Sequence, residues 1–112
     1  MAKSFNQVIL MGNLTRDPEL RTTPSGQDVA SLSIALNRSY KDSEGEWKET
    51  TDYVDIVCWA KLAITVSEHL HTGSKIMITG RLQSRQWEAE GVKKSKLEVL
   101  ATDVTFLDQK SE

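Results

Sequence analysis

The chain has 112 residues, enough for one globular domain with a modest core and too few for two. Its formal net charge of -2 excludes a strongly basic, general polyanion binder, so any nucleic-acid site has to depend on local charge. The single cysteine excludes an internal disulfide. Without an apolar leader or a membrane-length apolar run the sequence predicts an intracellular, cytoplasmic protein, and an organellar or phage origin stays open.

Two strands and a long loop are predicted first. Residues 7–12 form a continuous apolar run that is too short for an ordinary helix, so they predict a strand. Residues 13–28 predict a loop, because both prolines of the chain fall in it, and this loop carries Arg16 and Arg21. Apolar residues alternate over residues 29–37, which indicates the second strand.

An acidic turn at residues 41–46 joins the second strand to a third one, predicted over residues 52–59. Successive side chains of a strand point to opposite faces, and here the aliphatic side chains share one face. Large rings are left on the outward face, where a soluble domain keeps them mainly to bind something. The buried face comprises Val54, Ile56 and Cys58, and the outward face comprises Tyr53, Asp55, Val57 and Trp59.

A short helix is predicted over residues 60–71, because apolar residues recur there at helical spacing and Gly73 follows as a terminator. Strand alternation resumes at Ile76 and defines a fourth strand. One face of that strand is aliphatic, and the other carries basic and aromatic side chains at alternate positions. These side chains are Arg81, Arg85 and Trp87.

A turn at Glu90-Gly91 leads to the last strand, predicted over residues 96–107. The apolar parity of this strand slips near Thr102-Asp103, which indicates a bulge or a break. Residues 108–112 are predicted to be a polar end. Lysines give this second hairpin a basic tip. They are Lys93, Lys94 and Lys96.

Three strands, a helix and two strands predict an all-β fold with one short helix: the oligonucleotide-binding barrel, a five-stranded, partly open Greek key. We assign residues 1–107 to this one domain. In such barrels the ligand crosses the second and third strands and is flanked by the loops after the first and fourth. The aromatic and basic side chains above fall in those places, and unpaired bases stack on rings while phosphates follow positive charge. Single-stranded nucleic acid is therefore the predicted ligand.

The predicted site has two kinds of residue. Tyr40 shares the parity of Leu36, so it reaches a ligand only if the second strand twists or continues beyond the barrel. Tyr53, Trp59 and Trp87 have an alternative role at a barrel end or subunit contact, and Trp47 has one in a solvated, acidic hairpin tip. The stacking residues are Tyr40, Tyr53, Trp59, Trp87 and Trp47, and the backbone-contacting residues are Arg16, Arg21, Lys61, Arg81, Arg85, Lys93, Lys94 and Lys96.

No enzyme, cofactor or metal site is predicted, because the chain has no phosphate-binding glycine loop, metal-ligand spacing or nucleophile motif. His69 and His71 are two apart on the predicted helix and do not face each other, so they are predicted to be solvated. Cys58 is predicted to be a small core residue. The alternative that stays open is a barrel that serves as a protein-interaction module of a replication or primosome assembly.

Ordered segments along nearly the whole chain resemble one known family. They are residues 6–14 (NQVILMGNL), 17–21 (DPELR), 50–59 (TTDYVDIVCW), 61–63, 73–74 and 80–87. The family is that of the bacterial-type single-stranded DNA-binding proteins, and the resemblance is to their DNA-binding domain. It implies sequence-independent binding and protection of single-stranded DNA in replication, recombination and repair, as a nucleoid-associated homotetramer. It also implies base stacking at Tyr40, Tyr53, Trp59 and Trp87.

The sequence departs from the family pattern in three places. Tyrosines at 40 and 53 stand where tryptophan is frequent, which keeps a stacking ring. Val54-Asp55 stands where some members carry a His-Arg pair, so the contacts of that pair are not carried over. Members continue into a Gly, Pro and Gln-rich linker and an acidic tip that recruits replication and repair proteins, whereas this sequence ends at Glu112. Tail-dependent partners are therefore not expected.

Overall fold

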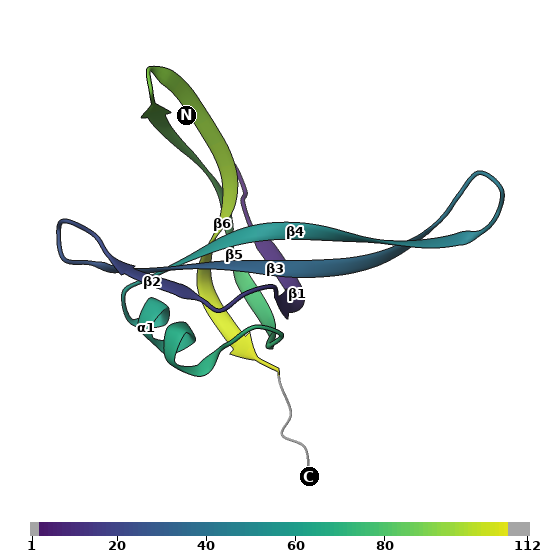
Figure 1. The fold of residues 1–112 in the computed structure, drawn as a ribbon, viewed down its shortest axis with the longest axis horizontal. Helices are drawn as coiled ribbons and strands as arrows, with labels where there is room; N and C mark the ends of the chain where they lie inside the picture. The colour runs from purple at the N-terminus through teal and green to yellow at the C-terminus, as the bar shows by residue number, and fades with distance from the viewer. Residues whose placement is uncertain (1–2, 108–112) are drawn as a thin grey trace, which may run out of the picture.

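Two long antiparallel ribbons cross in the computed structural model, which describes residues 3–107, and a small barrel lies where they cross (Figure 1). One ribbon pairs β3 with β4, and the other pairs β5 with β6. The mostly β class with a single short helix is thereby confirmed for the described residues. The elements are β1 Val8–Leu14, β2 Glu19–Thr22, β3 Asp28–Lys41, β4 Trp47–Trp59, α1 Ala60–His69, β5 Lys75–Ala89 and β6 Val92–Phe106.

Five strands close the barrel in the order β1-β5-β6-β4-β3, and β1 pairs again with β3. The seams that complete the closure are short. β1 meets β3 at Leu14 opposite Ile34, and β4 runs parallel to β6 with Ile56 opposite Val99. β2 adds to the outer edge of β3 and lies outside the closed ring. The predicted five-stranded oligonucleotide-binding barrel is confirmed.

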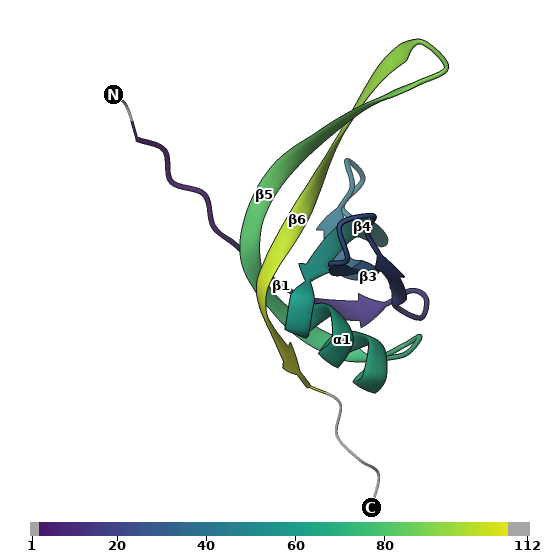
Figure 2. The same cartoon turned by 90° about the vertical axis from the view of Figure 1, so that its left-hand side faces the viewer.

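The core consists of the side chains that point inward from each strand. Alternate residues of β3 and β4 point inward, and burying each large aliphatic side chain stabilises the fold by about 1.5–3 kcal/mol. α1 lies across one end of the barrel and adds Ala63 and Val66 (Figure 2). Within the described part of the chain, no helix has both the length and the apolar character needed to cross a bilayer. The largest fully buried apolar side chains are Leu32, Ile34, Ile56, Ile76, Ile78, Val66 and Val99.

The loop predicted over residues 13–28 is wrong in part, because it contains β2, Glu19–Thr22. All residues of this strand are exposed and they pair with β3 at its edge. An exposed edge strand needs no alternation of apolar residues, so the hydrophobic pattern gave no sign of it. The helix ends at His69, so His71 lies beyond it in the following turn. Residues 108–112, predicted to be a polar end, lie outside the described residues.

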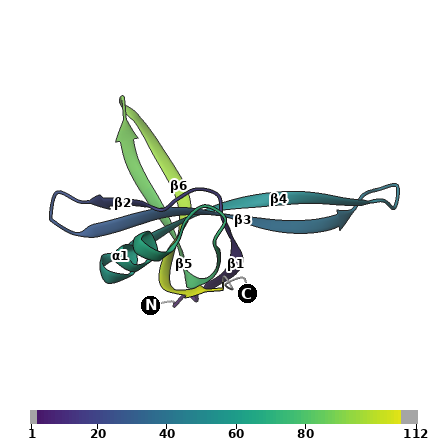
Figure 3. The ribbon, with the colours of Figure 1, turned by 60° about the horizontal axis from the view of Figure 1, so that its bottom comes forward.

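Both ribbons continue well past the barrel, and they project in different directions (Figure 3). β4 begins at Trp47 and β6 at Val92, which is earlier than the expected starts at residues 52 and 96. The additional residues are mostly polar, and the two apolar ones, Trp47 and Val92, are exposed, because beyond the barrel neither face of a ribbon covers a core. Leu82 has the inward parity of β5, but it is exposed because it lies where the β5–β6 ribbon leaves the barrel.

The predicted irregularity of the last strand is confirmed as a bulge. Thr79 pairs with Asp103 and Gly80 with Ala101, so Thr102 is the extra residue. The strands approach closely here, since a Cβ at Gly80 would clash with the carbonyl oxygen of Leu100. Gly80 therefore allows a backbone contact that a side chain would block.

Candidate nucleic-acid interface

A groove of about 350 Å³ lies on the outer face of the barrel, where β4 meets β6. We call it the central groove. It is formed by the loop after β1, by β2, by the start of β3 and the end of β4, and by the base of the β5–β6 ribbon. The structure thus brings together predicted residues that are far apart in the sequence. They are Arg16, Arg21, Trp59, Arg85 and Lys96.

Trp59 ends β4 and precedes the first turn of α1, in extended conformation with φ -119°. The next residue, Ala60, has φ 57°, so the chain turns sharply immediately after the ring. The neighbouring Cys58 points into the core, and burial raises the pKa of its thiol to about 12. Trp59 has the opposite parity and is 40% exposed, which leaves its indole on the central groove. Cys58 is therefore a core residue, as predicted.

The β5–β6 ribbon carries rings and cations on one face. Its register sets Arg85 opposite Lys96 and Trp87 opposite Lys94, and directly opposed residues of a pair share a face. The Arg85 guanidinium lies 4.8 Å from the centroid of the Trp87 ring, in a cation–π contact. Lys93 is opposite Glu88 and so belongs to the other face. A more open depression of about 410 Å³ surrounds Trp87 on this ribbon.

The tip of this ribbon is a two-residue turn. Glu90 has φ 53° and Gly91 has φ 78°. Positive φ at both central residues defines the type I′ turn that suits a twisted hairpin, and glycine adopts such angles without strain. The predicted turn at Glu90-Gly91 is confirmed, and it places the basic tip at the far end of the ribbon.

The β3–β4 ribbon presents its aromatic residues on two faces. Tyr53 lies opposite Ala35 and is 69% exposed. Trp47 shares its face, with the Lys41 ammonium 5.9 Å from the ring centroid. Tyr40 has the opposite parity, as the sequence predicted, and it is exposed because the ribbon extends beyond the barrel. The β3–β4 ribbon is twisted along its length (Figure 1). Such a twist turns successive side chains toward different sides.

One ion pair lies on the Tyr40 face of this ribbon. Arg38 donates from Nε to Oδ2 of Asp52 over 2.7 Å. The hydrogen bond to this carboxylate raises the pKa of the Arg38 guanidinium above its ordinary value. Both side chains are about half exposed, so the pair fixes local geometry more than stability.

Two predicted backbone contacts, Lys61 and Arg81, line neither the central groove nor the depression at Trp87. Lys61 is exposed on the first turn of α1, and Arg81 is exposed on β5 below the ribbon. A strand bound in the central groove would have to extend past it to reach either cation.

The sequence reasoning missed that carboxylates line the central groove. Glu98 is only 3% exposed, and it accepts hydrogen bonds from Arg85 Nε over 3.3 Å and Gln83 Nε2 over 3.2 Å. Asp55 Oδ2 lies 2.7 Å from Lys96 Nζ. Glu98 and Lys96 are two residues apart on β6, and residues two apart on a strand point to the same face. The sequence could therefore have placed both side chains on one face.

A second missed residue positions the loop that carries Arg16. Oδ1 of Asp17 accepts hydrogen bonds from the backbone N–H and the hydroxyl of Thr72, both over 2.8 Å. The backbone N–H, followed by the hydroxyl, lowers the pKa of the Asp17 carboxyl from its ordinary value. The turn after α1 thereby holds the start of the loop that borders the central groove.

The comparisons with known proteins agree with one another. The model of the "Single-strand binding protein family" matches residues 5–107. The chain is 42% identical to single-stranded DNA-binding protein 1 of Chlorobaculum tepidum, over 98% of this chain and 69% of that protein. It is 44% identical to single-stranded DNA-binding protein B of Bacillus subtilis, over 95% of this chain and 93% of that protein.

A similar solved structure is that of a Plasmodium falciparum SSB in complex with ssDNA. It superposes with a TM-score of 0.87 at 27% sequence identity, and the match covers 96% of this chain and 99% of that one. The match therefore includes the ribbons as well as the barrel.

Proposed function

Because the chain belongs to the single-strand binding protein family, we propose that it binds and protects single-stranded DNA, without reading sequence, in replication, recombination and repair. The observation that carries this proposal is the central groove. There Trp59 lies among four cations, which come from the loop after β1 and from β2, β5 and β6. A flat ring and distributed positive charge are what unpaired bases and a phosphate backbone require.

Binding takes place by stacking combined with backbone contacts. A base on Trp59 contributes about 1–3 kcal/mol whatever its identity, because every base has a flat face. Arg16 and Arg21 hold phosphates at one side of the central groove, and Arg85 and Lys96 hold them at the other. The strand then continues onto the ribbons. The stacking residues there are Tyr40, Tyr53, Trp47 and Trp87, with Lys61, Arg81, Lys93 and Lys94 as outlying backbone contacts.

We expect titration with a long oligothymidine to quench the intrinsic tryptophan fluorescence strongly. Bases stacked on Trp59 and Trp87 cause the quenching, and higher salt should weaken binding because phosphate contacts release counterions. The measurement is fluorescence at low and high salt. A duplex of equal length serves as the control and should quench little.

A folded protein that shows no quenching by the oligothymidine would contradict the proposal. Salt-independent binding to a protein partner would then favour the alternative, an interaction module of a replication assembly, because a hydrophobic protein contact depends little on salt.

We propose further that the protein is a homotetramer, and the outer face of β1 supports an apolar contact between copies. Ile9 and Met11 are 60% and 55% exposed there, on neighbouring outward positions of one strand. Exposed apolar side chains grouped in this way are typical of protein contacts.

Native mass spectrometry is expected to give four times the chain mass for the wild type and a smaller species for Ile9→Lys, because a buried lysine opposes the contact. Ile64→Lys, at an exposed position on α1, is the matched control and should remain tetrameric. Tetramers of Ile9→Lys would show that β1 is not the interface.

A further inference from the structure

The cations of the central groove are not equally available to a ligand. Lys96 and Arg85 each have a carboxylate partner, in Asp55 and Glu98. Among the residues that the structure describes, no ion pair involves Arg16 or Arg21, although both line the same groove. Two of the four cations that line the central groove are therefore already paired with a carboxylate of the protein itself.

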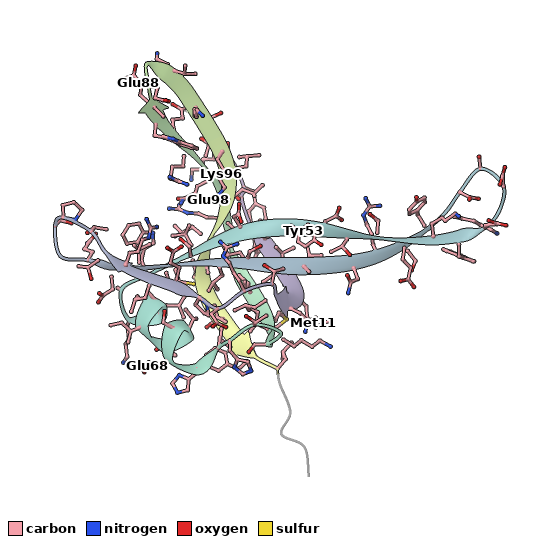
Figure 4. The ribbon with its side chains drawn as sticks, in the orientation of Figure 1. Met11, Tyr53, Glu68, Glu88, Lys96 and Glu98 are labelled. Atoms are coloured by element: carbon pink, nitrogen blue, oxygen red, sulfur yellow. The ribbon has the colours of Figure 1, made fainter. Side chains whose placement is uncertain are left out.

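The two carboxylates differ in how they can act. Glu98 is almost fully buried and also accepts a hydrogen bond from Gln83, so it positions Arg85 and stays in place. Asp55 lies on the outward face of β4 with its side chain 40% exposed, and the Lys96 side chain is 38% exposed. An ion pair this exposed to water is weak and opens readily. Figure 4 shows Lys96 and Glu98 where β6 crosses β4.

We propose that Asp55 is an internal competitor of the DNA phosphate for Lys96, and that it limits the affinity of the central groove. The inference rests on the proposed function, single-strand binding. A phosphate that approaches Lys96 has to replace the Asp55 carboxylate, which remains nearby as a like charge. Asp55 therefore weakens binding twice, by occupying the lysine and by repelling the phosphate.

The proposal predicts a specific change in salt dependence. Each phosphate neutralised on a single strand contributes about 0.7 to the slope of log K against log salt. In the wild type, Lys96 exchanges the Asp55 carboxylate for a DNA phosphate. Its contribution to this slope is therefore smaller than that of an unpaired lysine. Without the carboxylate at 55, Lys96 should behave as a full phosphate contact.

The test compares Asp55→Asn with the wild type by oligothymidine titration at several salt concentrations. We expect about threefold to tenfold tighter binding at low salt and a slope steeper by about 0.7 for Asp55→Asn. Glu68→Gln is the matched control, since it changes net charge equally on α1, away from the central groove (Figure 4). Its affinity should stay close to that of the wild type. Thermal denaturation verifies that each variant is folded.

A second pair of variants separates competition from a general charge effect. Lys96→Gln should weaken binding more in the Asp55→Asn background than in the wild type, because only the freed lysine holds a phosphate fully. Equal losses in both backgrounds, or an Asp55→Asn protein that binds no tighter than Glu68→Gln, would overturn the proposal. A wild-type protein that does not bind oligothymidine would instead refute the proposed function itself.

Discussion

Replacing Trp59 by alanine is expected to weaken binding of single-stranded DNA about tenfold or more, which corresponds to the loss of one stacked base at about 1–3 kcal/mol. The indole lies in the central groove among four cations, so it is placed where a base would meet it. Oligomers of thymidine, cytidine and adenosine should lose affinity alike, since stacking does not read base identity. Fluorescence anisotropy of labelled oligomers, which does not depend on the protein's own tryptophans, is the measurement.

Trp59→Phe is the conservative control and should retain most of the affinity, because it keeps an aromatic face. The helix start should survive either change, since the Trp59 side chain makes no capping hydrogen bond to α1. Circular dichroism of Trp59→Ala checks this. An alanine variant that is folded and binds all three oligomers as tightly as the wild type would place the bases elsewhere.

Gly80→Ala should be the most destabilising of the small substitutions discussed, with a loss of about 3 kcal/mol in the free energy of unfolding. The added Cβ would clash with the backbone carbonyl of Leu100, at the point where the Thr102 bulge brings β5 and β6 together. The carbonyl group is part of the paired backbone of β6, so it cannot move away as a flexible side chain could. For a domain of this size the loss corresponds to a fall in Tm of roughly 10 °C.

Gly45→Ala is the matched control for this prediction. Gly45 has φ 82° in the β3–β4 turn, and nothing lies within 4 Å of a Cβ there. Alanine at that position meets only backbone strain, which costs about 1–2 kcal/mol. Calorimetry should therefore give a clearly lower Tm for Gly80→Ala than for Gly45→Ala. Equal Tm values would mean that β5 and β6 can separate without cost.

The fold could be predicted from the sequence wherever a strand has one buried face. Ile56 and Cys58 alternate with outward residues on β4, and the change of parity near Thr102 correctly indicated the bulge. The pattern failed where neither face is buried. Glu19–Thr22 and the outer part of β4 carry only one large apolar side chain each, Leu20 and Trp47, so only their pairing with β3 reveals them as strands.

The candidate site was predictable as a set of residues and not as a set of contacts. Strand parity placed Trp59 and Tyr53 outward, and Arg85 and Trp87 on one face, as the structure has them. The pairing of Asp55 with Lys96 joins two strands that are separated by the helix and β5, so no local pattern contains it. Their role in binding remains a prediction until the variants are measured.

The two ribbons have a consequence for how this protein can change over generations. Beyond the barrel both faces of a ribbon meet solvent, and backbone hydrogen bonds in such regions open at a much lower free energy than those of a core. If the β5–β6 ribbon contacts the ligand as proposed, a substitution near Glu88, far out on this ribbon, changes binding while the barrel below keeps its folding free energy (Figure 4). Selection can then change the affinity for a ligand one side chain at a time, because the stability of the barrel depends on a different set of residues.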